Sequence, residues 1–242
     1  MADRGAIHHV MSSYLFILCP PYSGSTLLWK LISTSAQVSS LPTEGQMLPE
    51  LQDVMREKPW DKQHTLPWTH IKQVWDKHWN AEKPLWLEKS PPNIIRTNEI
   101  QQHFTPAQFI IMVRNPYAQA EGLMRRNHWP AKRAANFALM CLRTQLENSK
   151  LLKNALVLTY ESLVSDPAGT CAHLAQFIPA LSDINHKASF EVHSIDGTLT
   201  RPITDLNMKK IESLPPHTRD TFTQAFKEDA ALLNDWNYDL MV

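Results

Sequence analysis

The chain has 242 residues, and its 24 basic side chains balance 24 acidic ones, so the formal net charge is zero. A neutral chain offers no electrostatic footprint for nucleic acid or for an anionic membrane, and we expect neither as a partner. Only six residues are glycine, where average usage would give roughly seventeen. They lie too far apart for GxGxxG or GxxxxGK[ST], which excludes the glycine-rich dinucleotide and triphosphate loops.

Cysteine usage and hydropathy indicate the compartment. Cys19, Cys141 and Cys171 are widely spaced within apolar runs, which argues against a disulfide framework or a zinc site and for a reducing environment. The first apolar run, 15–19, is far shorter than the ~20 residues of a membrane span. It also lacks the basic head of a signal peptide. We therefore expect a cytoplasmic protein.

Short apolar runs alternate with helical patterns along the chain. The runs at 14–19, 85–87, 109–113 and 156–158 predict strands, and their continuous apolar character suits strands that are covered on both faces. Helices are predicted at 24–35, 117–127, 132–153, 168–177 and 218–233. Alternating strands and helices predict an α/β fold, a three-layer sandwich around a central parallel sheet.

We expect a single domain over residues 1–242, with a tryptophan-rich helical insert at about 45–84. Five of the eight tryptophans lie between residues 45 and 86. Four apolar side chains of this segment are spaced as one face of a helix: Trp68, Ile71, Trp75 and Trp79. Such a face predicts packing against the sheet, whereas some of the rings could instead line an acceptor pocket.

The first predicted strand ends in two prolines, and Ser23-Gly24-Ser25-Thr26 then opens a helix. The first turn of a helix has unpaired backbone N–H groups and the positive end of the helix dipole. A glycine admits an anion to the backbone, and the hydroxyls can donate further hydrogen bonds. The loop therefore predicts a phosphate site of the P-loop-like strand–loop–helix kind. The alternative is a plain N-cap, since serine and threonine are good caps.

Two cationic side chains follow predicted strands at the edge where open α/β sheets bind ligands. Arg114 follows the third strand, and its planar guanidinium suits bidentate binding of phosphate. Lys89 follows the second strand and could offer a compact positive charge to a transferring group. Alternatively, Arg114 is a surface arginine, and Lys89 is solvated or paired with Glu88.

Four motifs in order resemble those of the sulfotransferases that use 3′-phosphoadenosine 5′-phosphosulfate (PAPS), and in particular the bacterial and tyrosylprotein branch. PYSGST at 21–26 is similar to the 5′-phosphosulfate loop, and IIMVRNP at 110–116 to the 3′-phosphate motif. EKSP at 88–91 and LTYESLVSDP at 158–167 resemble two further motifs of that branch. The resemblance spans residues 14–240.

The resemblance implies PAPS as co-substrate and no metal, and it assigns roles to individual residues. Ser23, Gly24, Ser25 and Thr26 would hold the 5′-phosphosulfate, and Arg114 the 3′-phosphate. Lys89 would neutralise charge on the transferring sulfonyl group. The other implied cofactor contacts are Arg126, Tyr160, which would help close the adenosine site, and Arg201, a late basic residue.

A hydroxyl acceptor has a high pKa, so its proton must pass to a positioned base as the S–O bond forms. Glu44 falls within one residue of the base position in the tyrosylprotein branch, and we expect it to be the general base. The alternative is a carboxylate that caps the next helix.

Two residues of the expected cofactor site depart from the family pattern. Tyr22 stands where the family has lysine or arginine, and a phenol donates a hydrogen bond but brings no positive charge. Gly122 stands where the family has serine, so a hydroxyl is lost from the 3′-phosphate site unless a backbone N–H replaces it.

The sequence thus predicts in-line transfer of a sulfonyl group from PAPS to a small-molecule alcohol or phenol. Two alternatives remain open. One is a nucleotide or small-molecule kinase of the wider P-loop class. The other is a catalytically silent relative that binds a nucleotide or a partner.

Overall fold

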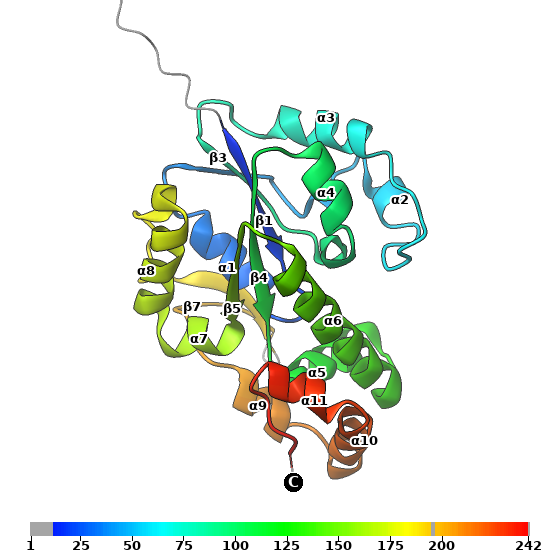
Figure 1. Ribbon diagram of the computed structural model, residues 1–242. Helices are drawn as coiled ribbons and strands as arrows, with labels where there is room; N and C mark the ends of the chain where they lie inside the picture. The colour runs from blue at the N-terminus through cyan, green and yellow to red at the C-terminus, as the bar shows by residue number, and fades with distance from the viewer. Residues whose placement is uncertain (1–11, 195–196, 242) are drawn as a thin grey trace, which may run out of the picture.

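The computed structural model describes residues 12–194 and 197–241 (Figure 1). Five parallel strands form the central sheet in the order β2-β3-β1-β4-β5. They are β1 (Ser13–Leu18), β2 (Val38–Ser40), β3 (Leu85–Glu88), β4 (Ala107–Val113) and β5 (Ala155–Thr159). The four predicted strands are confirmed. Sequence analysis missed β2 because it is three residues long and two of them are serine.

Helices cover both faces of the sheet, which explains why the strands show no alternation of apolar and polar residues. In β1, Tyr14, Phe16 and Leu18 pack into one hydrophobic cluster, and Leu15 and Ile17 pack into another on the opposite face. Neither face of this strand meets water, so both sets of side chains are apolar. The expected three-layer α/β sandwich is confirmed.

The two helical layers are unequal. One face carries α1 (Ser25–Ile32), α7 (Tyr160–Ser165) and α8 (Pro167–Phe177), beside the antiparallel hairpin of β6 (Phe190–Ser194) and β7 (Gly197–Arg201). The other face carries α2 (Gln52–Met55), α3 (Trp68–His78), α4 (Thr97–His103), α5 (Pro116–Asn127), α6 (Ala131–Leu151), α9 (Asn207–Glu212), α10 (Pro216–Lys227) and α11 (Ala230–Asp235). Turns of 3₁₀ helix lie at Gly45–Met47, Pro91–Ile95 and Pro179–Leu181.

The helix predicted over 218–233 is wrong in one respect, because two helices occupy that stretch. Helix α10 ends at Lys227, and Asp229 leaves the helical conformation with φ −140° and ψ 51° before α11 begins. The Asp229 carboxylate accepts a hydrogen bond from Arg143 Nη2 at 2.5 Å, on α6. A pattern that is continuous in the sequence is thus interrupted at Asp229, which also contacts a distant helix.

The tryptophan-rich segment packs its helix face into the core. Trp68, Ile71 and Trp75 of α3 are buried, and the Trp75 ring lies 5.4 Å from Phe104 between centroids. Trp79, just beyond the helix, stacks on Trp86 of β3 at 5.6 Å. Aromatic pairs at such distances stabilise a core beyond the area they bury.

The parallel arrangement brings the carboxyl ends of four strands to one edge of the sheet. Strand β1 leads through the Gly24 loop into α1, β3 ends at Glu88, β4 leads to Arg114, and β5 leads to Tyr160. In Figure 1 the arrow of β4 points toward α9 and α11, which lie at this end of the molecule. Ligands bind at this edge in open α/β sheets. Among the helices of the described residues, none has the length and apolar character needed to cross a membrane.

Candidate active site

A cavity of about 590 Å³ opens at the carboxyl edge of the sheet. Nine of the twelve residues predicted for the site line it: Tyr22, Gly24, Ser25, Thr26, Glu44, Arg114, Arg126, Tyr160 and Arg201. The other three lie directly behind this lining. Ser23 is within the loop, Lys89 contacts Glu44, and Gly122 adjoins Tyr22. The tertiary structure thus gathers into one place residues that are spread over 180 positions of the sequence.

The Gly24 loop has a backbone that only glycine adopts readily. Gly24 has φ +91°, and a Cβ built on it would lie 2.5 Å from Cδ2 of Tyr160. Gly24 is the N-cap of α1, yet no side chain caps this helix, so the first-turn N–H groups remain available. The Ser23 hydroxyl is buried and has no hydrogen-bond partner among the described residues. These features favour an anion site over a plain N-cap.

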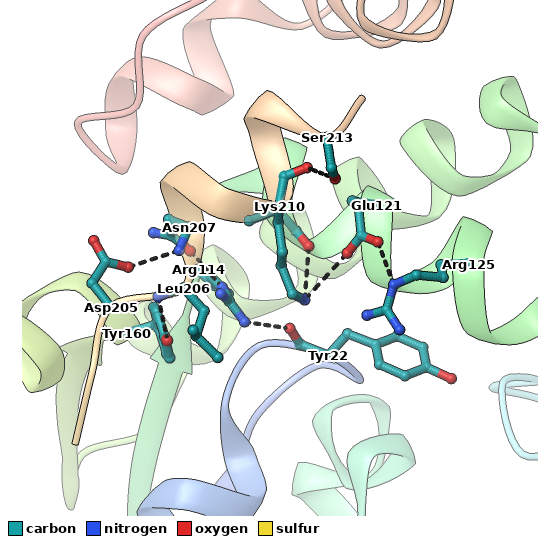
Figure 2. A network of polar contacts seen from close by, with 11 residues as sticks. Tyr22, Arg114, Glu121, Arg125, Tyr160, Asp205, Leu206, Asn207, Lys210 and Ser213 are labelled. Carbon is teal, nitrogen blue, oxygen red and sulfur yellow. Dashed lines mark hydrogen bonds and ion pairs between the residues drawn. The ribbon is translucent and has the colours of Figure 1, made fainter. Parts of the chain in front are cut away.

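Arg114 follows β4 and is held by contacts with its neighbours, as Figure 2 shows. Its Nε donates to Asn207 Oδ1 at 2.7 Å, and its Nη1 donates to the Tyr22 carbonyl at 3.1 Å. The guanidinium carbon lies 3.8 Å from the centroid of the Tyr160 ring. Nη2 is buried and finds no hydrogen-bond partner in the described part of the chain. A buried guanidinium nitrogen without a partner is costly, so this geometry is suited to an incoming anion.

Glu161 supports this arrangement, and sequence analysis did not identify it. Its Oε1 accepts hydrogen bonds from Asn207 Nδ2 at 2.5 Å and from the backbone N–H of Asn115 at 2.9 Å. Its Oε2 accepts from the Tyr238 hydroxyl at 2.9 Å. Glu161 therefore orients Asn207, which orients Arg114. In the sequence, its position next to Tyr160 in the TYES stretch could have indicated that it lies at the site.

Glu44 and Lys89, predicted independently, form an ion pair. Lys89 Nζ lies 2.5 Å from Glu44 Oε1, and the Lys89 side chain is 4 % exposed while that of Glu44 is 27 % exposed. Gln46 Nε2 donates to the other Glu44 oxygen at 2.7 Å. Glu44 does occupy the N-cap position of a 3₁₀ turn, but its carboxylate makes no capping bond. The carboxylate instead lines the cavity.

Glu88 does not pair with Lys89. It is 1 % exposed and accepts hydrogen bonds from the Gly45 N–H at 3.0 Å, Ser90 Oγ at 2.5 Å and Asn93 Nδ2 at 2.5 Å. Burial raises the pKa of Glu88 to about 7, although the hydrogen bonds from Ser90 and Gly45 oppose the shift. Glu88 fixes the turn that carries Glu44, a role that sequence analysis did not predict.

Tyr22 and Gly122, the two departures from the family pattern, contact each other. Tyr22 has φ +62°, and a Cβ on Gly122 would lie 2.7 Å from the Tyr22 Cβ. The Tyr22 hydroxyl donates to Asn127 Oδ1 at 2.5 Å. A serine at 122 would therefore collide with Tyr22 as it stands. The two changes form one altered contact rather than two separate losses.

The remaining predicted residues lie around the cavity. Tyr160 donates its hydroxyl proton to the Thr204 carbonyl at 3.2 Å and accepts from the Leu206 N–H at 3.2 Å, which ties the segment after β7 to the site. Several lining residues were not predicted, because their neighbourhood exists only in the folded chain: Arg56, Arg125, Trp129, Phe137 and Lys210. Trp60 also lines the cavity, as the alternative for the rings of the tryptophan-rich segment allowed.

Comparisons with known proteins identify the family and the fold. The sequence model of a sulfotransferase family matches residues 15–179. No curated protein matches the chain in sequence.

Three solved structures have a similar fold. The sulfotransferase domain of the Synechococcus olefin synthase is 21 % identical with a TM-score of 0.58, over 97 % of this chain and 98 % of that one. A sulfotransferase from Alicyclobacillus acidocaldarius is 14 % identical with a TM-score of 0.58, over 94 % and 97 %. A mouse sulfotransferase complexed with PAP is 13 % identical with a TM-score of 0.52, over 96 % and 92 %. From the match over residues 15–179 we conclude that this chain belongs to the sulfotransferase family.

Proposed function

We propose that this protein transfers a sulfonyl group from PAPS to the hydroxyl of a small alcohol or phenol, with Glu44 as general base. One observation carries the proposal: a single cavity is lined by the Gly24 loop, by Arg114 and by the carboxylate of the Glu44–Lys89 pair. Anion-binding groups and a base next to a buried cation are the requirements of such a transfer.

The residues present fit a nucleotide that carries two anionic groups. The first turn of α1 and the unpartnered Ser23 hydroxyl would hold the 5′-phosphosulfate. Arg114 would bind the 3′-phosphate through its unpartnered Nη2. Bound there, PAPS would supply the activated sulfonyl group. The PAP in the mouse protein of similar fold supports the choice of donor.

Glu44 and Lys89 would have different roles in the transfer. The Glu44 carboxylate would accept the proton of the acceptor hydroxyl as its oxygen attacks sulfur. The Lys89 ammonium, 2.5 Å from that carboxylate, would stabilise the negative charge that develops on the transferring group and the leaving phosphate. Because Lys89 is buried, its charge would act through little intervening water.

Aromatic side chains suggest the class of acceptor. Trp60, Trp129 and Phe137 line the cavity, and the Phe137 ring lies 4.8 Å from Trp60 and 5.2 Å from Trp129 between centroids. Aromatic walls suit a small molecule with an apolar or aromatic body. This wall supports a phenol or an apolar alcohol as the acceptor.

We also propose that the protein works in the cytoplasm. Its three cysteines are free and buried, which suits a reducing compartment.

The proposal is tested by incubating the purified protein with PAPS and a panel of phenols and alcohols, and by following sulfated products and PAP by mass spectrometry. We expect sulfated phenols with PAP formed in equal amount. Phosphorylated products from ATP and magnesium would instead support a kinase. Nucleotide binding without transfer to any hydroxyl in the panel or in a metabolite extract would support a silent relative. Either result would overturn the proposal.

A further inference from the structure

Lys210 is a buried lysine that lines the active-site cavity and that neither the motifs nor the comparisons assign to a role. It lies on α9, one turn after Asn207, the residue that holds Arg114. Figure 2 shows its side chain reaching from α9 to Glu121 of α5, beside Tyr22 and Arg114. Lysine is almost never fully buried without a partner that compensates its charge.

The contacts of the Lys210 ammonium do not satisfy it. Nζ donates one hydrogen bond, to the Ala118 carbonyl at 3.3 Å, although an ammonium has three donors. Glu121 Oε2 lies 3.5 Å away, close enough for an ion pair, yet that oxygen has no hydrogen-bond partner in the described residues. The other Glu121 oxygen is taken by Arg125 Nε at 2.5 Å. The pair with Glu121 is therefore loose, and it does not account for burying the ammonium.

The space for Lys210 depends on Gly122. A Cβ built on Gly122 would lie 3.3 Å from Lys210 Nζ and 2.7 Å from the Tyr22 Cβ. A side chain at this position of α5 would press on both residues. Because Gly122 has no side chain, the Lys210 ammonium can approach the cavity wall between α5 and the backbone of Tyr22. The Tyr22 carbonyl accepts a hydrogen bond from Arg114.

Two cationic groups with unused donors therefore face the same cavity. Arg114 Nη2 is buried without a hydrogen-bond partner in the described chain, and Lys210 Nζ has one long hydrogen bond. Three carboxylates act on Arg114, and each has other partners. Asp205 accepts from the Asn207 N–H at 2.8 Å, Glu161 accepts from Asn207, Asn115 and Tyr238, and one oxygen of Glu121 accepts from Arg125. A dianionic group could satisfy both cations at once.

We propose that Lys210 and Arg114 Nη2 together bind the phosphate on the ribose of the nucleotide, so that Lys210 distinguishes an adenosine 3′,5′-bisphosphate from an adenosine 5′-monophosphate. This inference rests on the proposed function, because it assumes that the donor is such a nucleotide. Lys210 supplies from α9 the donor that Gly122 lacks on α5.

The protonation of Lys210 gives the proposal a second measurable consequence. Burial lowers its pKa to about 7, and the nearby guanidiniums of Arg114 and Arg125 lower it too, while Glu121 raises it. The groups that face it are Arg114 at the end of β4, Glu121 and Arg125 on α5, and Tyr22 before α1. A bound phosphate would favour the ammonium form, so binding of the bisphosphate should be coupled to proton uptake.

The test is calorimetric titration of the protein with adenosine 3′,5′-bisphosphate and with AMP, using the wild type, Lys210→Met and the control Lys209→Met. Lys209 is the exposed neighbour of Lys210 on the same helix. We expect Lys210→Met to lose at least tenfold in affinity for the bisphosphate and less than threefold for AMP, and Lys209→Met to keep both affinities. Equal losses for the two nucleotides, or no loss, would overturn the proposal.

Proton uptake keeps the inference testable if Lys210→Met fails to fold. At pH 8, where phosphates with a second pKa near 6 are already dianions, the wild type is titrated in buffers of different ionisation enthalpy. We expect close to one more proton taken up with the bisphosphate than with AMP, and an equal number would refute the assignment. A wild type that binds neither nucleotide would overturn the proposed donor as well. A preference for the bisphosphate that survives in Lys210→Met would overturn the role of Lys210 alone.

Discussion

At the scale of single residues, the site depends on side chains whose partners come from distant parts of the chain. Glu44 and Lys89 are 45 positions apart and meet at 2.5 Å. Glu88 accepts a hydrogen bond from the Gly45 N–H and so holds the turn before Gln46. Hydrogen bonds thus join the turn that carries Glu44 to the strand end that carries Glu88 and Lys89. Small changes here should separate binding from chemistry.

Glu44→Gln should keep nucleotide binding and lose turnover. Glutamine is nearly the same shape, but its amide cannot take the acceptor proton, so we expect kcat to fall by roughly 10²–10⁴. The control is Glu50→Gln, because Glu50 is an exposed carboxylate that contacts His78 at 3.3 Å outside the cavity. Steady-state kinetics and nucleotide titration check the prediction, and a Glu44→Gln enzyme with the parent kcat would remove the role of general base.

Lys210 should make the stability of the fold depend on pH. The pKa of Lys210 is about 7 in the folded chain and near its ordinary 10.5 in the unfolded chain. Between these values the unfolded state binds more protons, so this residue makes the free energy of unfolding rise with pH. Relative to Lys210→Met, the wild type should gain about 2 kcal/mol from pH 7 to pH 9.

Urea unfolding of both proteins at the two pH values measures this difference. Subtracting the variant removes the contributions of other groups that titrate in the same range. A difference that stays constant with pH would show that the lysine is charged throughout.

At the scale of elements, the junction of β1 and α1 sets the shape of the proposed anion site. The loop contains two positive φ values, +62° at Tyr22 and +91° at Gly24, and both residues lie against side chains from other elements. Sequence alone indicated the glycine, because prolines precede it and a helix follows. The contact of Gly24 with Tyr160, at the start of α7, required the fold.

Gly24→Ala should abolish nucleotide binding while the chain still folds. A positive φ costs alanine about 1–2 kcal/mol, and the new methyl would lie 2.5 Å from the Tyr160 ring, so the loop must move. Titration with adenosine 3′,5′-bisphosphate and circular dichroism test both parts. The control Ser33→Ala removes the hydroxyl contacts with the Trp29 carbonyl and with Ser40 Oγ, at the far end of α1, and should bind normally. Unchanged binding by Gly24→Ala would argue against the loop as the anion site.

At the scale of the whole molecule, the site is closed by segments from the end of the chain. Glu161 joins the end of β4, helix α9 and Tyr238 through hydrogen bonds of 2.5–2.9 Å. Tyr117 of α5 likewise accepts a bond from the Met241 N–H at 3.0 Å. These contacts couple the last residues of the described chain to the position of Arg114.

Tyr238→Phe should cost about 1–2 kcal/mol of unfolding free energy, since it leaves one carboxylate oxygen of Glu161 without its donor. Glu161→Ala should cost more, and it should also weaken nucleotide binding, because Asn207 then loses the partner that orients it toward Arg114. Denaturant unfolding and nucleotide titration of both variants distinguish the two effects. Equal nucleotide affinity in Glu161→Ala and the wild type would contradict the coupling.

The sequence by itself determined four of the five strands of the central sheet, and it predicted the loop that we propose as an anion site. Continuous apolar runs predict strands that are buried on both faces, and Gly24 between proline and helix predicts the loop, because these signals are local. The same holds for Arg114, which follows a strand directly. Glu44 and Lys89 were named from their motifs, each without its partner.

Only the tertiary structure decided which side chains meet. Residues at least 45 positions apart meet in three places: in the Glu44–Lys89 pair, in the contact of Tyr22 with Gly122, and where Lys210 approaches the cavity. The break between α10 and α11 at Asp229 likewise did not show in the sequence pattern. Hydrophobic periodicity records which face of an element is buried, but it does not record which charged groups the packing of those elements brings together. The few glycines illustrate both cases: the neighbours of Gly24 in the sequence predict a phosphate loop, whereas the role of Gly122 depends on Tyr22 and Lys210.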